Sequence, residues 1–428
     1  MSVATMKRRT KPAAQTDTVV LPMQKRDPIT LTIFTVLMAA MALGASGSSV
    51  MSFAGATHWF NIPNLTLPSA LSIWILTIIS AVLCAVSWKL AFDRKPLSGW
   101  FLGGSGLAFI VAFLIWTVAG KTSSVMPVVS LLIGGLTLAV PLIFGSLSGV
   151  ICERSGVINI AIEGQLLFGA FMGAVVASAV GNAYVGLLGS VVGGALVGVL
   201  LALFTVKFRT DHIIVGVVLN MLVLGLTSFL FSTVLKSSPD LNKTMALDRL
   251  PIPVLSDVPF IGPILFNQSI LVYLAFIAVI GLQIALFRSR WGLRTRACGE
   301  HPKAADTVGI KVNRMRWLNV IGASALAGLG GAFFTLGQNL AFSKDMTAGN
   351  GFIALAAMIL GRWNPKGALA AALLFGFATN LASVMQSVGS PLPAEFMLML
   401  PYVVTVLAVA GFVGAVRAPA AEGKPYPA

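Results

Sequence analysis

The chain has 428 residues, of which 57% are hydrophobic and only 10% are charged. Soluble globular domains carry about 25% charged residues, so this composition excludes an ordinary soluble protein and indicates a membrane protein. The formal net charge of +15 does not predict a nucleic-acid partner, because the basic residues stand in short loops between apolar runs, where they set topology.

No cluster of reactive side chains stands out along the chain. The cysteines and histidines are scattered and predict neither a disulfide framework nor a metal site: Cys84, Cys152, Cys298, His58, His212 and His301. The string AGKTS at 119–123 superficially resembles a phosphate-binding loop, but the glycine required five residues before the Gly-Lys pair is Ile115. We therefore expect no enzyme activity and no cofactor in this chain.

Residues 1–28 carry six Lys and Arg and no apolar period, and we expect them to form a disordered cytoplasmic tail. Apolar runs of about 20 residues follow, the length that crosses about 30 Å of hydrocarbon as a helix. The expected spans are 30–53, 69–91, 100–120, 126–150, 160–180, 184–206, 213–235, 268–287, 317–340, 351–361, 367–387 and 395–416. The run 351–361 is too short to cross unless kinked; if it re-entered, everything after it would change sides, and we favour a crossing.

The distribution of basic residues orients this path. With the N-terminus inside, inner segments hold 24 of the 29 Lys and Arg, whereas outer segments hold five: Lys121, Lys236, Lys243, Arg249 and Lys344. The positive-inside rule therefore predicts that both termini are cytoplasmic. The domains expected are a tail (1–28), an N-terminal transmembrane hairpin (29–99), a core (100–416) and a second cytoplasmic tail (417–428).

Two loops are longer than the rest. The outer loop 236–267 is rich in proline and predicts an ordered extracytoplasmic cap. The inner loop 288–316 holds eight basic residues, and its middle reads HPKAADTVGI. Pro302 suits the first turn of a helix and Gly309 its end, so we expect a short helix there. The alternative is a charged loop that serves only topology.

Glu163 stands between two of the most apolar stretches, in ERSGVINIAIEGQLL at 153–167. A carboxylate at the centre of a bilayer costs about 2.5–3.5 kcal/mol on insertion scales and usually faces a bundle interior or water. In one interpretation Glu163 lies near the inner surface and pairs with Arg154 or caps a helix. In the other, Glu163 and Asn159, four residues apart on one helical face, shape the wall of a pathway.

Other polar groups in the spans are few. An uncharged polar substrate could be held by amides and by aromatic stacking. The candidates are Asn220, Gln338, Asn339, Phe342 and Asn350. Amides can equally join helices to one another, and for any single one of these amides we favour that structural role.

Several motifs, which recur in order over about residues 126–424, resemble a known family. They are ERSGVINIAIEGQLLFGAFMGA, TDHIIVGVVLNMLVLGLTSFL, GLRTRACGEHPKAADTVGIKVNR, LAGLGGAFFTLG and GFIALAAMILGRWNPKGALAAALLFG. They are similar to permease subunits of bacterial ATP-binding-cassette (ABC) importers. The similarity is greatest to the nucleoside and simple-sugar branch, related to ribose and branched-chain amino acid permeases. The C-terminal VRAPAAEGKPY also resembles the nucleoside branch.

The resemblance implies an all-α polytopic membrane bundle with a type II importer core of about ten helices, here with a two-helix N-terminal addition. It also implies that the loop 288–316 holds a coupling helix that docks on an ATPase subunit. The family's Glu-Ala-Ala element reads Lys303-Ala304-Ala305 here, so the first glutamate is missing. The expected coupling residues are Glu300, Pro302, Lys303, Ala304, Ala305, Asp306 and Gly309.

The function implied is that of a permease subunit forming the pathway for nucleosides or simple sugars. The implied partners are a second permease, expected to form a heterodimer, two copies of an ATPase that binds ATP and Mg²⁺, and an extracytoplasmic substrate-binding lipoprotein. The implied location is the bacterial inner membrane. The alternative is a secondary transporter that couples a small polar solute to protons through Glu163.

Overall fold

The computed structural model describes residues 25–53, 62–95, 97–121, 124–389 and 417–427, and also Pro393, Phe396, Met399 and Tyr402. The chain forms two compact units. One comprises Met1–Val50 and Thr66–Met126, and the other comprises Met51–Leu65 and Pro127–Ala428. Among the described residues, ten helices are long and apolar enough to cross a membrane. This confirms the expected polytopic helical bundle; the expected span 395–416 lies outside the described residues except for three positions.

Three helices form the first unit: α1 (Arg26–Gly44), α2 (Ser69–Phe92) and α3 (Gly99–Thr117). The hydroxyl of Ser80 on α2 lies 2.9 Å from that of Thr35 on α1 and 2.7 Å from that of Ser105 on α3. Hydroxyl contacts of this kind join helices where the surrounding surface is apolar. The strands β1 (Ser48–Ser52), β2 (Leu65–Pro68) and β3 (Val125–Pro127) form a sheet in the order β2-β1-β3.

The first unit differs from the sequence-based expectation in two ways. Helix α3 packs with α1 and α2, so the boundary lies near residue 126 and the unit holds three helices, not a hairpin ending at 99. The first span ends at Gly44, not residue 53, because residues 48–52 form strand β1. Helix α1 also begins at Arg26, inside the segment expected to be a disordered tail; residues 1–24 lie outside the described part.

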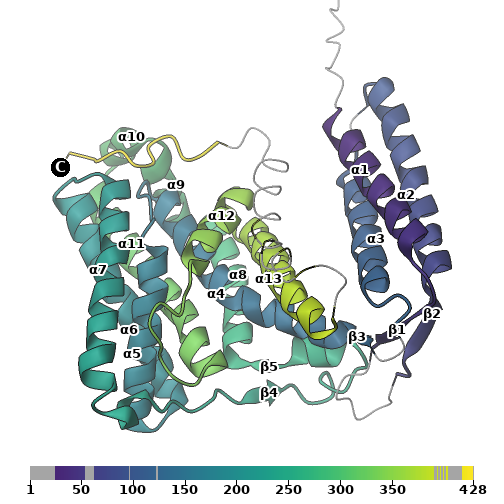
Figure 1. Ribbon diagram of the computed structural model, residues 1–428. Coiled ribbons are helices and arrows are strands. Elements are labelled where there is room, and N and C mark those ends of the chain that lie inside the picture. The colour runs from purple at the N-terminus through teal and green to yellow at the C-terminus, as the bar shows by residue number, and fades with distance from the viewer. Residues whose placement is uncertain are drawn as a thin grey trace, which may run out of the picture. The chain divides into compact units, whose positions relative to one another are not determined.

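The second unit is built around α4 (Val128–Arg154), α5 (Ile162–Val180), α6 (Ala183–Ala202) and α11 (Val312–Ala332). These four helices pack side by side (Figure 1). A Cβ on Gly328 of α11 would overlap the backbone of Ser190 and Gly194 on α6, so glycine permits this close approach. Small residues at such contacts are typical of membrane helices.

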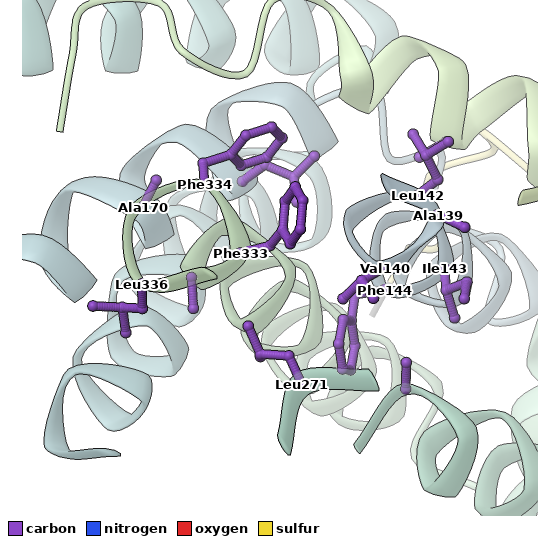
Figure 2. Packing of buried hydrophobic residues seen from close by; sticks show 14 of the residues in the cluster. Ala139, Val140, Leu142, Ile143, Phe144, Ala170, Leu271, Phe333, Phe334 and Leu336 are labelled. Carbon is purple, nitrogen blue, oxygen red and sulfur yellow. The ribbon is translucent and has the colours of Figure 1, made fainter. Parts of the chain in front are cut away.

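The remaining elements surround this group. The helices are α7 (His212–Leu230), α8 (Ile270–Arg288), α9 (Arg290–Glu300), α10 (Pro302–Thr307), α12 (Asn350–Leu360) and α13 (Pro365–Ser387). π-Helical turns continue α6, α7 and α11 as η1 (Leu203–Lys207), η2 (Phe231–Leu235) and η5 (Phe333–Gln338). Aromatic and aliphatic side chains of α4, α5, α8 and η5 meet in the core, including Phe144, Leu271, Phe333 and Phe334 (Figure 2).

The proline-rich loop 236–267 is ordered, as the sequence predicts. It contains η3 (Pro239–Asn242), β4 (Arg249–Pro251) and η4 (Gly262–Phe266), and β4 pairs antiparallel with β5 (Asn267–Ser269). Asn242 holds this loop to the segment after η5: it accepts from Phe342 N at 2.7 Å and donates to Phe342 O at 3.0 Å.

Helix α12 completes a broken crossing. It spans 11 residues, too few for the hydrocarbon core, and the irregular segment 339–349 precedes it. Beyond its C-terminal end, Trp363 O accepts a hydrogen bond of 3.0 Å from Arg154 Nε at the end of α4. The start of α11 lies at the same end, because Arg316 Nε donates to Ser155 O at 3.0 Å. The chain thus leaves this end along α11 and returns to it through 339–349 and α12, which is the crossing that the sequence favoured.

Candidate pathway and coupling surfaces

Glu163 caps a helix other than its own. Its Oε1 accepts from Gly349 N at 2.8 Å and its Oε2 accepts from Gly351 N at 2.6 Å. Helix α12 has no side-chain cap at its own N-terminus, so the carboxylate from α5 satisfies backbone donors that the helix leaves unpaired. A carboxylate at this position also interacts favourably with the positive end of the helix dipole.

The turn before α5 sets Glu163 in place and separates it from Asn159. Gly156 has φ +94°, which ends the helical path after α4, and α5 begins only at Ile162. Glu163 and Asn159 therefore do not share one helical face, and that expectation was wrong. Asn159 is fully buried and exchanges two 3.0 Å hydrogen bonds with Gln165, while its Nδ2 also donates to Ser148 Oγ at 3.1 Å.

Asn220 joins α7 to the start of α5. Its Oδ1 accepts from Gly164 N at 2.8 Å, and its Nδ2 donates to Ile160 O at 2.9 Å. Both polar atoms of the amide are thus engaged with the backbone on either side of Ile162. This is the helix-joining role that the sequence favoured for single amides in the spans.

The segment 339–349 has an unusual backbone. Leu340, Asp345 and Ala348 have φ of 57°, 55° and 44°, and Gly349 has φ 83°. Irregular backbone between membrane helices is tolerated where it is buried in protein or lines a water-filled cavity. Asp345 is exposed, and Lys344, also exposed, lies 5.9 Å above the ring of Phe231. Two exposed charges fit a water-filled space better than lipid.

A cavity of about 300 Å³ lies beside this segment. It is lined by Glu163, Gly164, Leu167, Val217, Asn220, Met221, Leu224, Asp345, Gly349 and Phe352. Phe352 at the start of α12 leaves 51% of its surface exposed, so its ring face is available for stacking. The cavity combines carboxylates, an amide and an aromatic ring, groups that suit a polar solute with hydroxyl and ring surfaces.

Three of the predicted amides line a different cavity, and Phe342, the predicted aromatic residue, does not line it. Gln338, Asn339 and Asn350 line a second cavity of about 220 Å³ together with Leu138, Pro141, Phe333, Phe334, Met346 and Thr379. Phe342 is only 2% exposed and packs against Phe171 and Phe231 at ring-centroid distances of 5.2 and 6.1 Å. Its ring anchors the segment 339–349 and offers no face to a substrate.

The loop 288–316 forms two short helices. Helix α9 is followed by the six-residue α10, with Pro302 in its first turn and Gly309 at φ +83° beyond its end, as the sequence predicts. Ala305 is buried against Cys298 and Val312. The residues of this helix and its end that face outward are Lys303, Ala304, Asp306, Thr307, Val308 and Gly309. Val308, which sequence reasoning did not select, is 75% exposed.

Two of the expected coupling residues contact the C-terminal tail. Glu300 Oε2 accepts from Ala420 N at 3.2 Å, and Asp306 Oδ2 accepts from the Tyr426 hydroxyl at 3.0 Å. In Figure 1 the tail runs past α10. Sequence reasoning expected a cytoplasmic tail here and noted its resemblance to the nucleoside branch, but did not predict that it packs.

Sequence reasoning also missed a set of hydrogen bonds between α4 and the turn after α12. Glu153 is 2% exposed and accepts from Trp363 Nε1, and Arg154 donates to Trp363 O. Arg362 and Trp363 both have positive φ, 56° and 51°. The available signal was an acid–base pair at the end of one span and a Trp-Asn-Pro sequence between two others, which marks a turn.

The described residues contain no group of three or more His, Cys, Asp or Glu that could hold a metal ion. Cys298 is fully buried, and burial raises the pKa of its thiol, which opposes the thiolate form that metals bind.

Comparison with known proteins gives consistent matches. Residues 131–409 match the family described as branched-chain amino acid transport system / permease component. The guanosine ABC transporter permease protein NupQ of Bacillus subtilis is 39% identical over 303 residues, covering 68% of this chain and 94% of the relative. The nucleoside ABC transporter permease protein NupC of Lactococcus lactis is 40% identical over 305 residues, with the same coverage. The guanosine ABC transporter permease protein NupP of B. subtilis is 28% identical over 262 residues, covering 60% of this chain and 74% of the relative. No solved structure matches the chain significantly.

Proposed function

Because the chain belongs to the branched-chain amino acid transport system / permease component family, we propose that it is the permease subunit of an ABC importer that carries nucleosides. The observation that carries this proposal is the identity of about 40% to two permeases named for guanosine and nucleosides, over 94% of their lengths. The cavity beside Glu163 supports it, since carboxylates accept hydrogen bonds from sugar hydroxyls and Phe352 can stack on a base.

We propose a second permease as the partner in the membrane. This chain is similar to both NupQ and NupP, two guanosine permeases of one organism, at 39% and 28% identity. Two related permeases in one system favour a heterodimer in which this chain is the half more similar to NupQ. Both halves would then face one pathway.

We further propose that the energy comes from outside this chain. A separate ATPase, bound at α10, would hold ATP and Mg²⁺, and an extracytoplasmic binding protein would deliver the nucleoside. This arrangement places the protein in the bacterial inner membrane with α10 and both termini in the cytoplasm, consistent with the excess of basic residues in the inner segments.

Proton coupling through Glu163 is less well supported. Both carboxylate oxygens already accept short backbone hydrogen bonds at the start of α12, at 2.8 and 2.6 Å. These two hydrogen bonds account for Glu163 as an anchor of α12 without a role in proton transfer.

The test is uptake of labelled guanosine, adenosine, cytidine and ribose by cells expressing the permease pair, the ATPase and the binding protein, in a host lacking its own nucleoside transport. We expect nucleoside uptake that persists when a protonophore collapses the proton gradient. Uptake should stop when the ATPase loses its catalytic carboxylate. Uptake driven by a pH gradient without the ATPase would contradict the proposal, as would transport of ribose alone.

A further inference from the structure

The C-terminal tail, residues 417–427, packs against the inner end of the second unit. Ala421 N donates to Gly299 O at 2.8 Å, and Gly423 N donates to Gly156 O at 3.2 Å. Pro419 and Ala421 are buried. The tail therefore joins the end of α9 to the turn between α4 and α5 by its own backbone.

A buried arginine depends on the tail for one of its acceptors. Arg316, in the first turns of α11, is 2% exposed. Its Nε donates to Ser155 O at 3.0 Å, its Nη1 to Lys424 O at 2.8 Å, and its Nη2 to Cys298 O at 3.5 Å. A guanidinium is always charged and is costly to bury without acceptors, so removing the tail would leave the Nη1 donors unpaired.

The same tail reaches the short helix α10. The hydroxyl of Tyr426 donates to Asp306, and its ring packs against the buried cluster of Cys298, Ala305 and Val312. Farther back in the tail, the Glu422 carboxyl contacts that of Glu153, which accepts from Trp363 beyond α12. One continuous set of contacts thus runs from α10 through the tail to the turn that ends α12.

We propose that residues 417–427 are a clamp that positions α10 relative to the inner ends of α4 and α12. Tyr426 and the backbone of Lys424 are its positioning groups. This inference rests on the proposed docking of an ATPase at α10. A displacement of α10 would be transmitted through the clamp to the C-terminal end of α12. The N-terminal end of α12 is bonded to Glu163 beside the cavity.

The experiment compares the full chain with a chain ending at Val416, each assembled with its permease partner, ATPase and binding protein. The readouts are the stimulation of ATP hydrolysis by loaded binding protein and the nucleosides transported per ATP hydrolysed. We expect the truncated complex to assemble and hydrolyse ATP, but its stimulation should fall by about fivefold or more, the lower range of coupling effects between sites. A synthetic peptide of residues 417–428 should restore it. Unchanged stimulation in the truncated complex would overturn the clamp.

Point variants keep the proposal testable if truncation prevents assembly. Tyr426→Phe keeps the ring and removes the hydroxyl, and Asp306→Asn changes its acceptor. If this hydrogen bond transmits coupling, the double variant should be no more impaired than either single variant, because contacting residues do not act additively. Lys424→Ala is the matched control, since among the described residues its Nζ bonds to Ala420 O within the tail, while its backbone oxygen is retained. Additive effects of the two substitutions would overturn the proposal.

Hydrogen exchange separates failure of the clamp from failure of the proposed function. The amides of Ala421 and Gly423 should be protected in the isolated full-length chain, without nucleoside or ATP, and Tyr426→Phe should reduce that protection. Rapid exchange at both amides would overturn the clamp whatever the complex transports. Protected amides in a complex that shows no nucleoside-stimulated ATP hydrolysis would instead support seating of the clamp and contradict the proposed function.

Discussion

Glu163, a residue of α5, caps the N-terminus of α12, which has no side-chain cap of its own. The helix starts at Asn350 after Gly349, whose φ of 83° suits glycine, and no side chain of its own satisfies its first amides. The carboxylate also lies close to Gly351, where a Cβ would overlap Glu163 itself. The start of α12 is therefore fitted to this one side chain, and the pair fixes one wall of the cavity.

Replacing Glu163 tests whether it anchors a helix or carries protons. Glu163→Gln retains one oxygen acceptor, so we expect a moderate fall in ATP-dependent nucleoside uptake. Glu163→Leu leaves both amides without a partner, at about 1–3 kcal/mol each, and should reduce uptake much further. Uptake per inserted protein would be measured at several pH values, because transport coupled to protons would change with pH. A Gln variant that is inactive despite normal expression and ATPase assembly would contradict the anchoring role.

Glu422 is predicted to make seating of the tail depend on pH. Its Oε2 has no hydrogen-bond partner among the described residues, its carboxyl contacts Glu153, and Arg316 is bonded to the tail two residues later. Burial raises the pKa of Glu422, so the seated tail holds a proton more tightly than the free tail does. Seating should be strongest below the free pKa of about 4.3 and should weaken as pH rises through the higher pKa of the seated state.

The affinity of a 417–428 peptide for the chain ending at Val416 measures this dependence directly. With Glu422→Gln the peptide has no ionisable group at position 422, so its affinity should vary less between about pH 5 and 8. The Lys424→Ala peptide serves as the control and should keep the slope of the native peptide. An affinity of the native peptide that rises with pH would contradict the assignment.

At the scale of elements, α10 has two faces with different roles. Ala305 points inward to Cys298 and Val312, whereas Ala304 and Val308 point outward. The family pattern selected Ala305 as a coupling residue, and the structure gives it the role of seating α10 on α9 and α11. The exposed apolar surface of Val308 is the better candidate for direct contact with an ATPase.

Substitutions on the two faces should separate seating from docking. Val308→Asp removes an exposed apolar anchor whose full burial would contribute about 1.5–3 kcal/mol, so ATPase co-purification should fall about tenfold or more. The thermal unfolding of the permease should not change. Ala305→Glu should lower the thermal midpoint itself, because it places a charge in a closed cluster. Thr307→Ser, on the exposed face, is the control; equal ATPase binding by Val308→Asp and this control would contradict the docking surface.

The sequence predicted elements better than it predicted contacts. Apolar length located the crossing helices, and Pro302 and Gly309 located α10, because these signals are local. Asn159 was expected on one helical face with Glu163, but it lies in the turn before α5, because the break at Gly156 depends on backbone geometry that a 3.6-residue period does not report. Phe342 was a candidate for stacking on a substrate, but the burial of an aromatic ring is decided by partners distant in sequence, here Phe171 and Phe231.

The pairing of Glu163 with α12 spans 186 residues of sequence, and that of Tyr426 with Asp306 spans 120. Single-sequence patterns carry no information about such distances. They could show that Glu163 needs a partner, because an unpaired carboxylate is costly in a membrane, but not which partner it has.

At the scale of the whole molecule, the family match from 131 to 409 lies within the second unit, as do all candidate pathway and coupling residues. The three helices of the first unit expose many large apolar side chains, among them Leu43, Leu71 and Ile78 at 79%, 61% and 60%. Such surfaces are suited to lipid or to another membrane protein. We infer that transport is carried by the second unit and that the first unit is an addition to it.

The same surface argument applies to α7 beside the cavity. Met221, which lines the cavity, is 68% exposed, and Leu222 is 51% exposed, yet the cavity holds two carboxylates that lipid would not solvate. A second permease placed against this face would enclose the polar groups in a shared pathway. One chain by itself leaves the cavity open on that side, so we expect the active assembly to contain two permeases.

Native mass spectrometry of the complex purified with its native partners tests this expectation. The result should be one copy of this chain, one copy of a second related permease and two copies of the ATPase. The complex carrying Val308→Asp should keep the second permease while losing at least one ATPase, because the permease contact lies at the α7 face and not at α10.

A stable monomer of this chain that transports nucleosides would contradict the paired pathway. A transport-competent complex with two copies of this chain would retain the pairing and contradict only the heterodimer. Loss of the second permease together with the ATPase would mean that the two permeases meet through α10, against the placement of their contact at the cavity.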